Sequence, residues 1–144
     1  MKVVVQRSKK SSVSVSEKIV NEIDNGMVLL VSFTQGDTID NILKMTKKIA
    51  NLRIFDDEEG VMNKSILDVG GEILSISQFT LYADTTKGNR PSYFKALNGE
   101  EAIKLYEKFN EEMNKYVVTK PGIFGAEMMV NISNDGPITL IMEF

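Results

Sequence analysis

The sequence predicts an α+β fold that is mostly β, with a curved or barrel-like antiparallel or mixed sheet and two main helices. Two observations support this. Short apolar or alternating runs, separated by turn signals, recur through most of the chain. Only two segments show the 3.6-residue apolar spacing of a helix. We expect a single domain over 1–144, because no repeat or linker divides the chain and this length supports one substantial core.

Four strands are expected in the first third of the chain, over residues 1–8, 11–17, 18–24 and 26–33. The second alternates serine with valine, which predicts that it is half buried. The third ends at an Asp-Asn-Gly turn signal. The fourth, GMVLLVSF, is nearly all apolar, which is typical of a strand buried on both faces.

The first helix should begin near Asp37. Its expected apolar side consists of Ile39, Ile42, Leu43, Ile49 and Leu52. Residues 53–65 should form two short extended pieces around an acidic turn. The spacing of the acidic run 56–59 matches no metal-binding loop, so a solvated turn is expected there rather than a cation site.

A further strand over 70–79 follows a glycine turn, and residues 83–94 should be a loop. Asn98 should cap the second helix, with Glu101 three positions later. The expected apolar stripe of this helix is Ile103, Tyr106, Phe109, Met113 and Tyr116. The last two strands, AEMMVNIS and ITLIMEF, are expected to pair as a hairpin around NDGP.

The chain has no histidine and no cysteine. This excludes a Ser-His-Asp triad, a Cys-His pair, a histidine-bound or thiolate-bound metal and any disulfide. Hydrolysis by this chain must therefore use carboxylates, lysine, tyrosine, hydroxyl groups, backbone dipoles or groups of the substrate itself.

The net charge of −3 and the pI near 5.1 argue against a general nucleic-acid binder, which usually carries a basic face. They leave open a nucleic acid that is held mainly at one end. No apolar run approaches membrane-spanning length and no signal peptide is evident, so a cytoplasmic protein is expected.

Two motifs carry the functional argument. In SISQFTLYAD (75–84), serine, glutamine and threonine stand where a buried strand ends. In NDGPITL (134–140), glycine precedes proline just before the last strand. Each has an ordinary explanation alone, because polar residues often cap strand ends and proline can begin an edge strand.

Together with KGNRPSYF, the opening QRSKKSSVSV, RIFDDEEGVMNKS and PGIFGAEMMVNISNDGPIT, the two motifs resemble the D-aminoacyl-tRNA deacylases, also called D-tyrosyl-tRNA(Tyr) deacylases. The resemblance covers essentially the whole chain. It implies hydrolysis of the ester between a D-amino acid and the 3′ end of tRNA, and also of glycine mischarged on tRNA(Ala). It further implies a homodimer with active sites at the interface. It implies that no metal or cofactor is needed and that neither a membrane nor DNA is a partner.

The resemblance also assigns residues. The ester is expected to lie at Ser77, Gln78, Phe79 and Thr80, where backbone N–H groups of Phe79 and Thr80 stabilise the oxyanion. We favour attack by water, assisted by the ribose 2′-OH, because no base is visible beside Thr80. The terminal adenosine is expected near Phe124, Ala126 and Met128. Lys87, Arg90 and Lys95 are candidates for phosphate contacts, with simple surface exposure as the alternative.

Chirality is best filtered by exclusion, because a rigid wall rejects every L side chain whatever its chemistry. The resemblance places Gly136 and Pro137 at this wall, in a cis bond whose carbonyls reach the partner's site and whose orientation Arg7 helps to fix. Three alternatives stay open at this point. One is a threonine-nucleophile esterase acting on another small ester, and another is a dimer that binds an RNA end or a nucleotide without catalysis. The third is a purely structural β-rich dimer, which would not bind adenosine.

Overall fold

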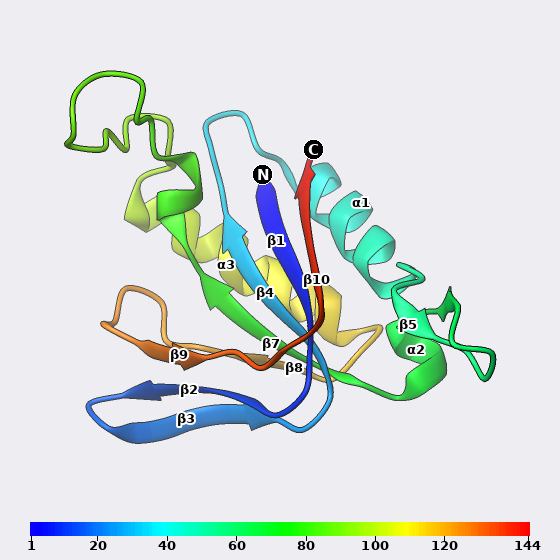
Figure 1. Cartoon of the computed structure of the whole chain (residues 1–144). Helices are drawn as coiled ribbons and strands as arrows, with labels where there is room; N and C mark the ends of the chain where they lie inside the picture. Colours follow the sequence, from blue (N-terminus) through cyan, green and yellow to red (C-terminus); the bar gives the residue numbers. More distant parts are fainter.

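The structure, a computed structural model that describes residues 1–144, is built around a five-stranded mixed sheet with the order β10-β1-β4-β7-β8 (Figure 1). Its strands are β1 (Lys2–Ser8), β4 (Gly26–Ser32), β7 (Glu72–Ser77), β8 (Thr119–Pro121) and β10 (Asn134–Glu143). The central strand β4 pairs antiparallel with β1 and parallel with β7. This position explains the apolar sequence of β4 and confirms that it is buried on both faces.

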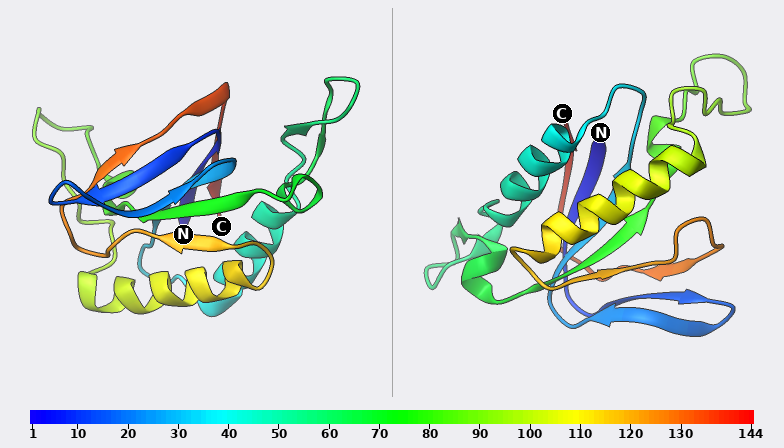
Figure 2. Two further views of the ribbon diagram at one scale, coloured as in Figure 1. Left: turned by 90° about the horizontal axis from the view of Figure 1, so that it is seen from below. Right: turned by 180° about the vertical axis from the view of Figure 1, so that it is seen from behind.

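A three-stranded sheet consists of β3 (Lys18–Ile23), β2 (Ser11–Val15) and β9 (Met129–Asn131), in that order. A short ribbon pairs β5 (Phe55–Asp56) with β6 (Met62–Lys64). The two long helices, α1 (Ile39–Ala50) and α3 (Gly99–Asn114), cover the same face of the five-stranded sheet (Figure 2). The predicted α+β class with two main helices is confirmed, and a one-turn helix, α2 (Ile66–Val69), was not predicted.

Two apolar clusters lie on opposite faces of the five-stranded sheet. The larger one packs alternate residues of β1 and β4, such as Val3 and Leu29, against α1 and α3. The smaller one packs Val28 and Leu74 against Val13 of the three-stranded sheet. Strand alternation therefore divides β4 between both clusters, and the sheet is held rigidly from both sides.

The helices differ from their predicted faces in detail. In α1, Ile39 and Leu43 are each 43% exposed, while Met45 and Ala50 are buried. The predicted stripe was wrong at these positions because the face that meets the sheet is rotated toward Met45. In α3, the helix ends at Asn114, so Tyr116 lies beyond its last turn and is exposed.

The beginning of α3 matches its prediction. The Asn98 side chain accepts a hydrogen bond from the Glu101 backbone N–H at 3.1 Å. This satisfies one of the backbone donors that are left free at a helix start.

The acidic turn at residues 56–59 is stabilised by its own hydrogen bonds, because the Asp57 carboxylate accepts from the backbone N–H groups of Glu59 and Val61. No helix in the structure combines the length and the apolar character needed to cross a membrane.

The predicted hairpin around NDGP was wrong. β9 pairs with β2, whereas β10 pairs with β1, so the chain passes from one sheet to the other between them. The turn residues are instead a bulge within β10. Gln6 faces Thr139 and Ser8 faces Asn134, so residues 135–138 stand opposite the single residue Arg7. Proline is tolerated here because β10 is an edge strand.

Candidate active site

A cavity opens where the parallel strands β4 and β7 end side by side. Ser77 is the last residue of β7, and the Gln78 backbone N–H extends the ladder to the Val31 carbonyl at 2.8 Å. The chain then turns sharply into a single 3-10 turn, Phe79–Tyr82. The carboxyl ends of neighbouring parallel strands commonly form ligand crevices, because the chain leaves the sheet there.

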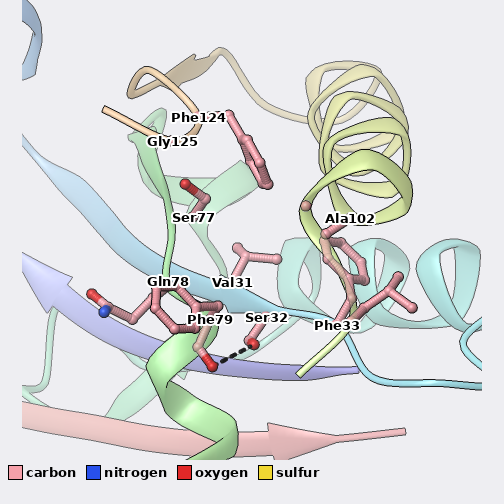
Figure 3. Close-up of a pocket in the computed structure, with 11 residues that line it drawn as sticks. Val31, Ser32, Phe33, Ser77, Gln78, Phe79, Ala102, Phe124 and Gly125 are labelled. Atoms are coloured by element: carbon pink, nitrogen blue, oxygen red, sulfur yellow. Dashed lines mark hydrogen bonds between the residues drawn. The ribbon is translucent and has the colours of Figure 1, made fainter. Parts of the chain in front are cut away.

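The first cavity has a volume of about 240 Å³ and lies between this strand end, the beginning of α3 and the segment around Phe124 (Figure 3). Its lining is Val31, Ser32, Phe33, Ser77, Gln78, Phe79, Leu97, Gly99, Ala102, Phe124 and Gly125. A second cavity of about 250 Å³ adjoins it and is lined by Ile76, Ser77, Gln78, Phe79, Gly125, Ala126, Met128 and Val130. The Ser77–Phe79 segment thus borders both cavities.

No titratable side chain lines either cavity. The linings contain only apolar residues, glycine, serine and one glutamine. The Gln78 side-chain amide donates to the Thr80 Oγ1 atom at 2.6 Å, so the threonine hydroxyl is held by an amide rather than by a base. A hydroxyl without a neighbouring base is a weak nucleophile.

The walls are fixed by contacts from α3. Tyr106 donates its hydroxyl to the Ser75 carbonyl at 2.8 Å, two residues before the site. The Phe124 ring packs on Tyr106 with 5.7 Å between ring centroids. Burial raises the pKa of the Tyr106 hydroxyl, which therefore remains a donor at neutral pH. Helix, strand end and Phe124 consequently form one rigid unit.

Backbone donors are also free at this point. In a 3-10 turn the first N–H groups have no partner within the turn. Here those groups belong to Phe79 and Thr80, and the preceding Gln78 side chain does not cap them. They supply positive dipoles at the strand end, where no cationic side chain lines the cavities.

The Gly136–Pro137 step lies far from this strand end within one chain. Through the registers, Ser77 corresponds to Val31, then Val3, then Met142 on β10. Residues 135–138 stand opposite Arg7, which lies four residues beyond Val3 on β1 at about 3.3 Å per residue, and three strand spacings of about 4.8 Å intervene. The separation is therefore roughly 20 Å, and a single chain does not bring the two motifs together.

Arg7 holds the bulge that contains this step. Its side chain is 9% exposed, and its Nε atom lies 3.1 Å from the Asp135 carboxylate. Nη1 donates to the Ile54 carbonyl at 2.9 Å and to the Asp56 carboxylate at 3.2 Å. The Gly136–Pro137 bond is cis, as the family resemblance implied, and both residues are exposed. Arg7 thus fixes the residue directly before an exposed backbone projection.

The family model described as D-Tyr-tRNA(Tyr) deacylase matches residues 4–143. The chain belongs to this family. A D-aminoacyl-tRNA deacylase of Clostridium novyi (strain NT) is 51% identical, covering 99% of this chain and 97% of the relative. One of Geobacillus sp. (strain WCH70) is also 51% identical, covering 99% and 95%.

Two solved structures share the fold of this chain. The chain is similar to the c-Myc DNA Unwinding Element Binding Protein, with a TM-score of 0.94 and 40% identity over 100% of this chain and 99% of that one. A probable eukaryotic D-amino acid tRNA deacylase has the same fold, with a TM-score of 0.84 at 15% identity over 98% and 97% of the two chains.

In this deacylase the structure brings together most of the residues that the sequence indicated. Ser77, Gln78, Phe79 and Phe124 line the first cavity, and Ala126 and Met128 line the second. Thr80 lies beside them without lining either cavity, while Arg7, Gly136 and Pro137 lie at the distant bulge. Sequence reasoning missed the contributions of β4 and of the beginning of α3, namely Val31, Ser32, Phe33, Leu97, Gly99 and Ala102.

Proposed function

We propose that this deacylase hydrolyses the ester of D-aminoacyl-tRNA at the end of β7, by attack of water and without a covalent acyl-enzyme. The observation that carries the proposal is the pair of cavities that share Ser77, Gln78 and Phe79 and contain no titratable side chain. The terminal adenosine would lie against Phe124, Ala126 and Met128. The scissile ester would then lie at the 3-10 turn.

The chemistry would rest on backbone groups. The N–H groups of Phe79 and Thr80 would donate to the oxyanion that forms when water attacks the ester carbonyl. Such a donor is typically worth about 10²–10³ in rate. The base is the part that the cavity does not supply, so the ribose 2′-OH of the substrate would orient and activate the water. Thr80, tied to Gln78, would position these groups.

The chiral filter would come from a second subunit. A wall of backbone excludes L side chains while accepting D residues and glycine, because glycine has no side chain to reject. The exposed Gly136–Pro137 step can supply such a wall, but it lies roughly 20 Å from Ser77 in its own chain. A homodimer in which each bulge enters the partner's cavity would join the two halves.

The proposal is tested by deacylation of D-tyrosyl-, L-tyrosyl- and glycyl-tRNA in excess chelator. We expect release of D-tyrosine and glycine, slow or no release of L-tyrosine, and no effect of the chelator. The last expectation follows because no cluster of three potential metal ligands exists in the structure. Activity that is lost in EDTA and restored by zinc would contradict it.

Two other functions are less well supported. A threonine-nucleophile esterase needs a base beside Thr80, and the partner there is an amide. Binding to DNA is named for the 40%-identical structure. Duplex binders usually carry a basic face, whereas this chain has a net charge of −3. A nucleic-acid substrate that is held only at its single-stranded end fits this net charge better. An aminoacyl-tRNA substrate also implies a cytoplasmic location for the enzyme.

A further inference from the structure

We propose that Phe79, Tyr93 and Phe94 form a stacking platform for the unpaired bases that precede the terminal adenosine of the tRNA. These three residues are called the aromatic platform below. The inference rests on the proposed function, because it describes how the same site holds the next part of its substrate. It assigns a role to Tyr93 and Phe94, which the proposed chemistry does not use, and to the ring of Phe79, whose backbone alone serves the ester.

The aromatic platform is unusually exposed. Phe94 is 90% exposed, Phe79 56% and Tyr93 41%. The Phe79 and Tyr93 rings make an edge-on contact, with 5.0 Å between their centroids. Single exposed apolar residues are ordinary on protein surfaces. Two exposed rings in contact, followed directly in the chain by a third ring that is almost fully exposed, indicate a ligand with flat, partly apolar surfaces.

The platform adjoins the cavities directly. Phe79 lines both cavities, and Leu97 and Gly99, shortly after Phe94 in the chain, line the first. The 83–94 loop projects from the body of the molecule beside the end of β7 (Figure 1). A polynucleotide whose last nucleoside occupied the cavities would therefore have its preceding nucleotides at this loop.

The loop is anchored at its base. Asp84 and Ser92 exchange two backbone hydrogen bonds, of 2.7 and 2.9 Å. After the aromatic residues, Leu97 N–H donates to the Phe33 carbonyl at 2.9 Å, and Thr34 Oγ1 donates to the Lys95 carbonyl. Tyr93 and Phe94 lie between these two anchors. The backbone that carries them is thus fixed before any ligand binds, which lowers the ordering cost of binding.

The charge of the loop favours RNA over a second copy of this chain as the occupant. Residues 84–97 carry three cations, Lys87, Arg90 and Lys95, against the single carboxylate of Asp84. The chain as a whole has a net charge of −3, so this cationic segment stands out. Aromatic rings with cations beside them are the usual combination for single-stranded nucleic acid, since bases stack and phosphates pair.

The test compares two substrates of different length. We expect Phe94→Ala to lower kcat/KM about tenfold on D-tyrosyl-tRNA, the effect of losing one base–aromatic stack, mainly through KM. On 3′-O-D-tyrosyl-adenosine, which lacks the preceding nucleotides, the loss should be less than about twofold, because this substrate has no base to stack. Phe94→Trp should restore activity on the tRNA.

Val61→Ala is the matched control, since Val61 is an exposed apolar residue on the β5–β6 ribbon. This control variant should leave kcat/KM unchanged on both substrates. Equal losses on both substrates in Phe94→Ala, or dissociation of a dimer by this variant, would overturn the platform. Wild-type inactivity on both substrates would overturn the proposed function together with this inference.

Salt dependence tests the charge argument separately. The association constant K is measured with deacylated tRNA at several salt concentrations. Arg90→Ala should reduce the slope of log K against log salt concentration by about 0.7, the value for one lost contact to a single strand. Phe94→Ala should leave the slope unchanged while weakening binding. Lys44→Ala, an exposed cation on α1, is the control and should alter neither quantity. An unchanged slope in Arg90→Ala would contradict contact between this loop and the RNA.

Discussion

Thr80 is the hydroxyl that hydrolytic chemistry would most readily use, and its only side-chain partner is the Gln78 amide at 2.6 Å. Removing the hydroxyl removes one hydrogen bond, which is worth about 0.5–1.5 kcal/mol, or about 2- to 12-fold in rate. We therefore expect Thr80→Ala to keep substantial kcat on D-tyrosyl-tRNA. Mass spectrometry of the wild type during turnover should show no acyl adduct. Complete inactivation of the variant, with a tyrosyl adduct on Thr80, would contradict attack by water.

Gly136 has a backbone that excludes a larger residue. Its φ is +122°, and an added Cβ would lie 2.9 Å from Ile138 Cγ1 and 3.0 Å from Ile138 N. We expect Gly136→Ala to displace the bulge and to lower activity on D-tyrosyl-tRNA or the preference for it over the L form. Gly60→Ala is the control, because Gly60 has a φ of +77° with no atom near its Cβ position.

The control variant should lose about 1–2 kcal/mol of stability from its left-handed backbone, with unchanged D/L discrimination. Thermal unfolding of both variants separates the two effects. If Gly136→Ala shows only the same loss of stability and the same discrimination as the wild type, the chiral filter lies elsewhere.

Individual site residues could be predicted where the signal is local. Ser77 and Phe79 lie in one short motif whose polar residues interrupt a buried strand, and the structure places both in the cavities. Ser32 and Phe33 line the same cavity but end an ordinary apolar strand. They could not be predicted, because the sequence does not show that β4 lies parallel to β7.

At the level of elements, local sequence patterns predicted which helices and strands exist better than they predicted which strands pair. The apolar runs predicted β4 and β7 and the helical spacing predicted α1 and α3. The prediction of a hairpin was wrong because its turn signal, Asn-Asp-Gly, forms part of a bulge opposite Arg7 and not a turn between paired strands. The stabilising partners of that bulge, Asp56 and Ile54, lie almost fifty residues from Arg7 in sequence. Contacts of that range leave no local pattern.

Helix α3 contains an ion-pair cluster that makes stability depend on pH. Glu112 is almost buried and lies 2.8 Å from Lys108 Nζ and 2.7 Å from Lys115 Nζ. Both lysines donate hydrogen bonds to the Glu112 carboxylate. These bonds lower the pKa of Glu112 below its usual 4.5, and the bond from Lys108 has the larger effect. A lowered carboxyl pKa adds stability above the unfolded-state pKa, and this stability is lost as the pH falls through the folded-state value.

We therefore expect Glu112→Gln to be less stable than the wild type at pH 7, and the difference to shrink near the pH at which Glu112 protonates. Urea unfolding midpoints at pH 7 and in the acid range measure this. Glu107→Gln, on an exposed position of the same helix, should show little difference at either pH. A constant difference between Glu112→Gln and the wild type across the range would show that packing, and not charge, explains the effect.

At the scale of the whole molecule, the proposed mechanism requires two motifs at opposite ends of a sheet to serve one reaction. The strand order and registers separate Ser77 from Gly136 by roughly 20 Å in one chain. Both motifs are at the surface, one in a cavity and the other on an exposed bulge of an edge strand. A two-fold symmetric dimer joins such surfaces reciprocally, because each subunit gives what it receives.

Mixed dimers test this arrangement. Ser77→Phe should fill the cavities of its own chain, and Gly136→Trp should carry a large side chain on the bulge into the partner's cavity and block it, so each variant alone should be inactive. In a dimer of one of each, one site carries both changes and the other carries neither. Random mixing after co-refolding should then restore about a quarter of wild-type activity, since half of the dimers are mixed and each has one intact site. If all site residues belonged to one chain, every chain in the mixture would remain defective and no activity would return. A mixture no more active than its separate components, or a fully active monomer in sedimentation, would therefore contradict a site shared between subunits.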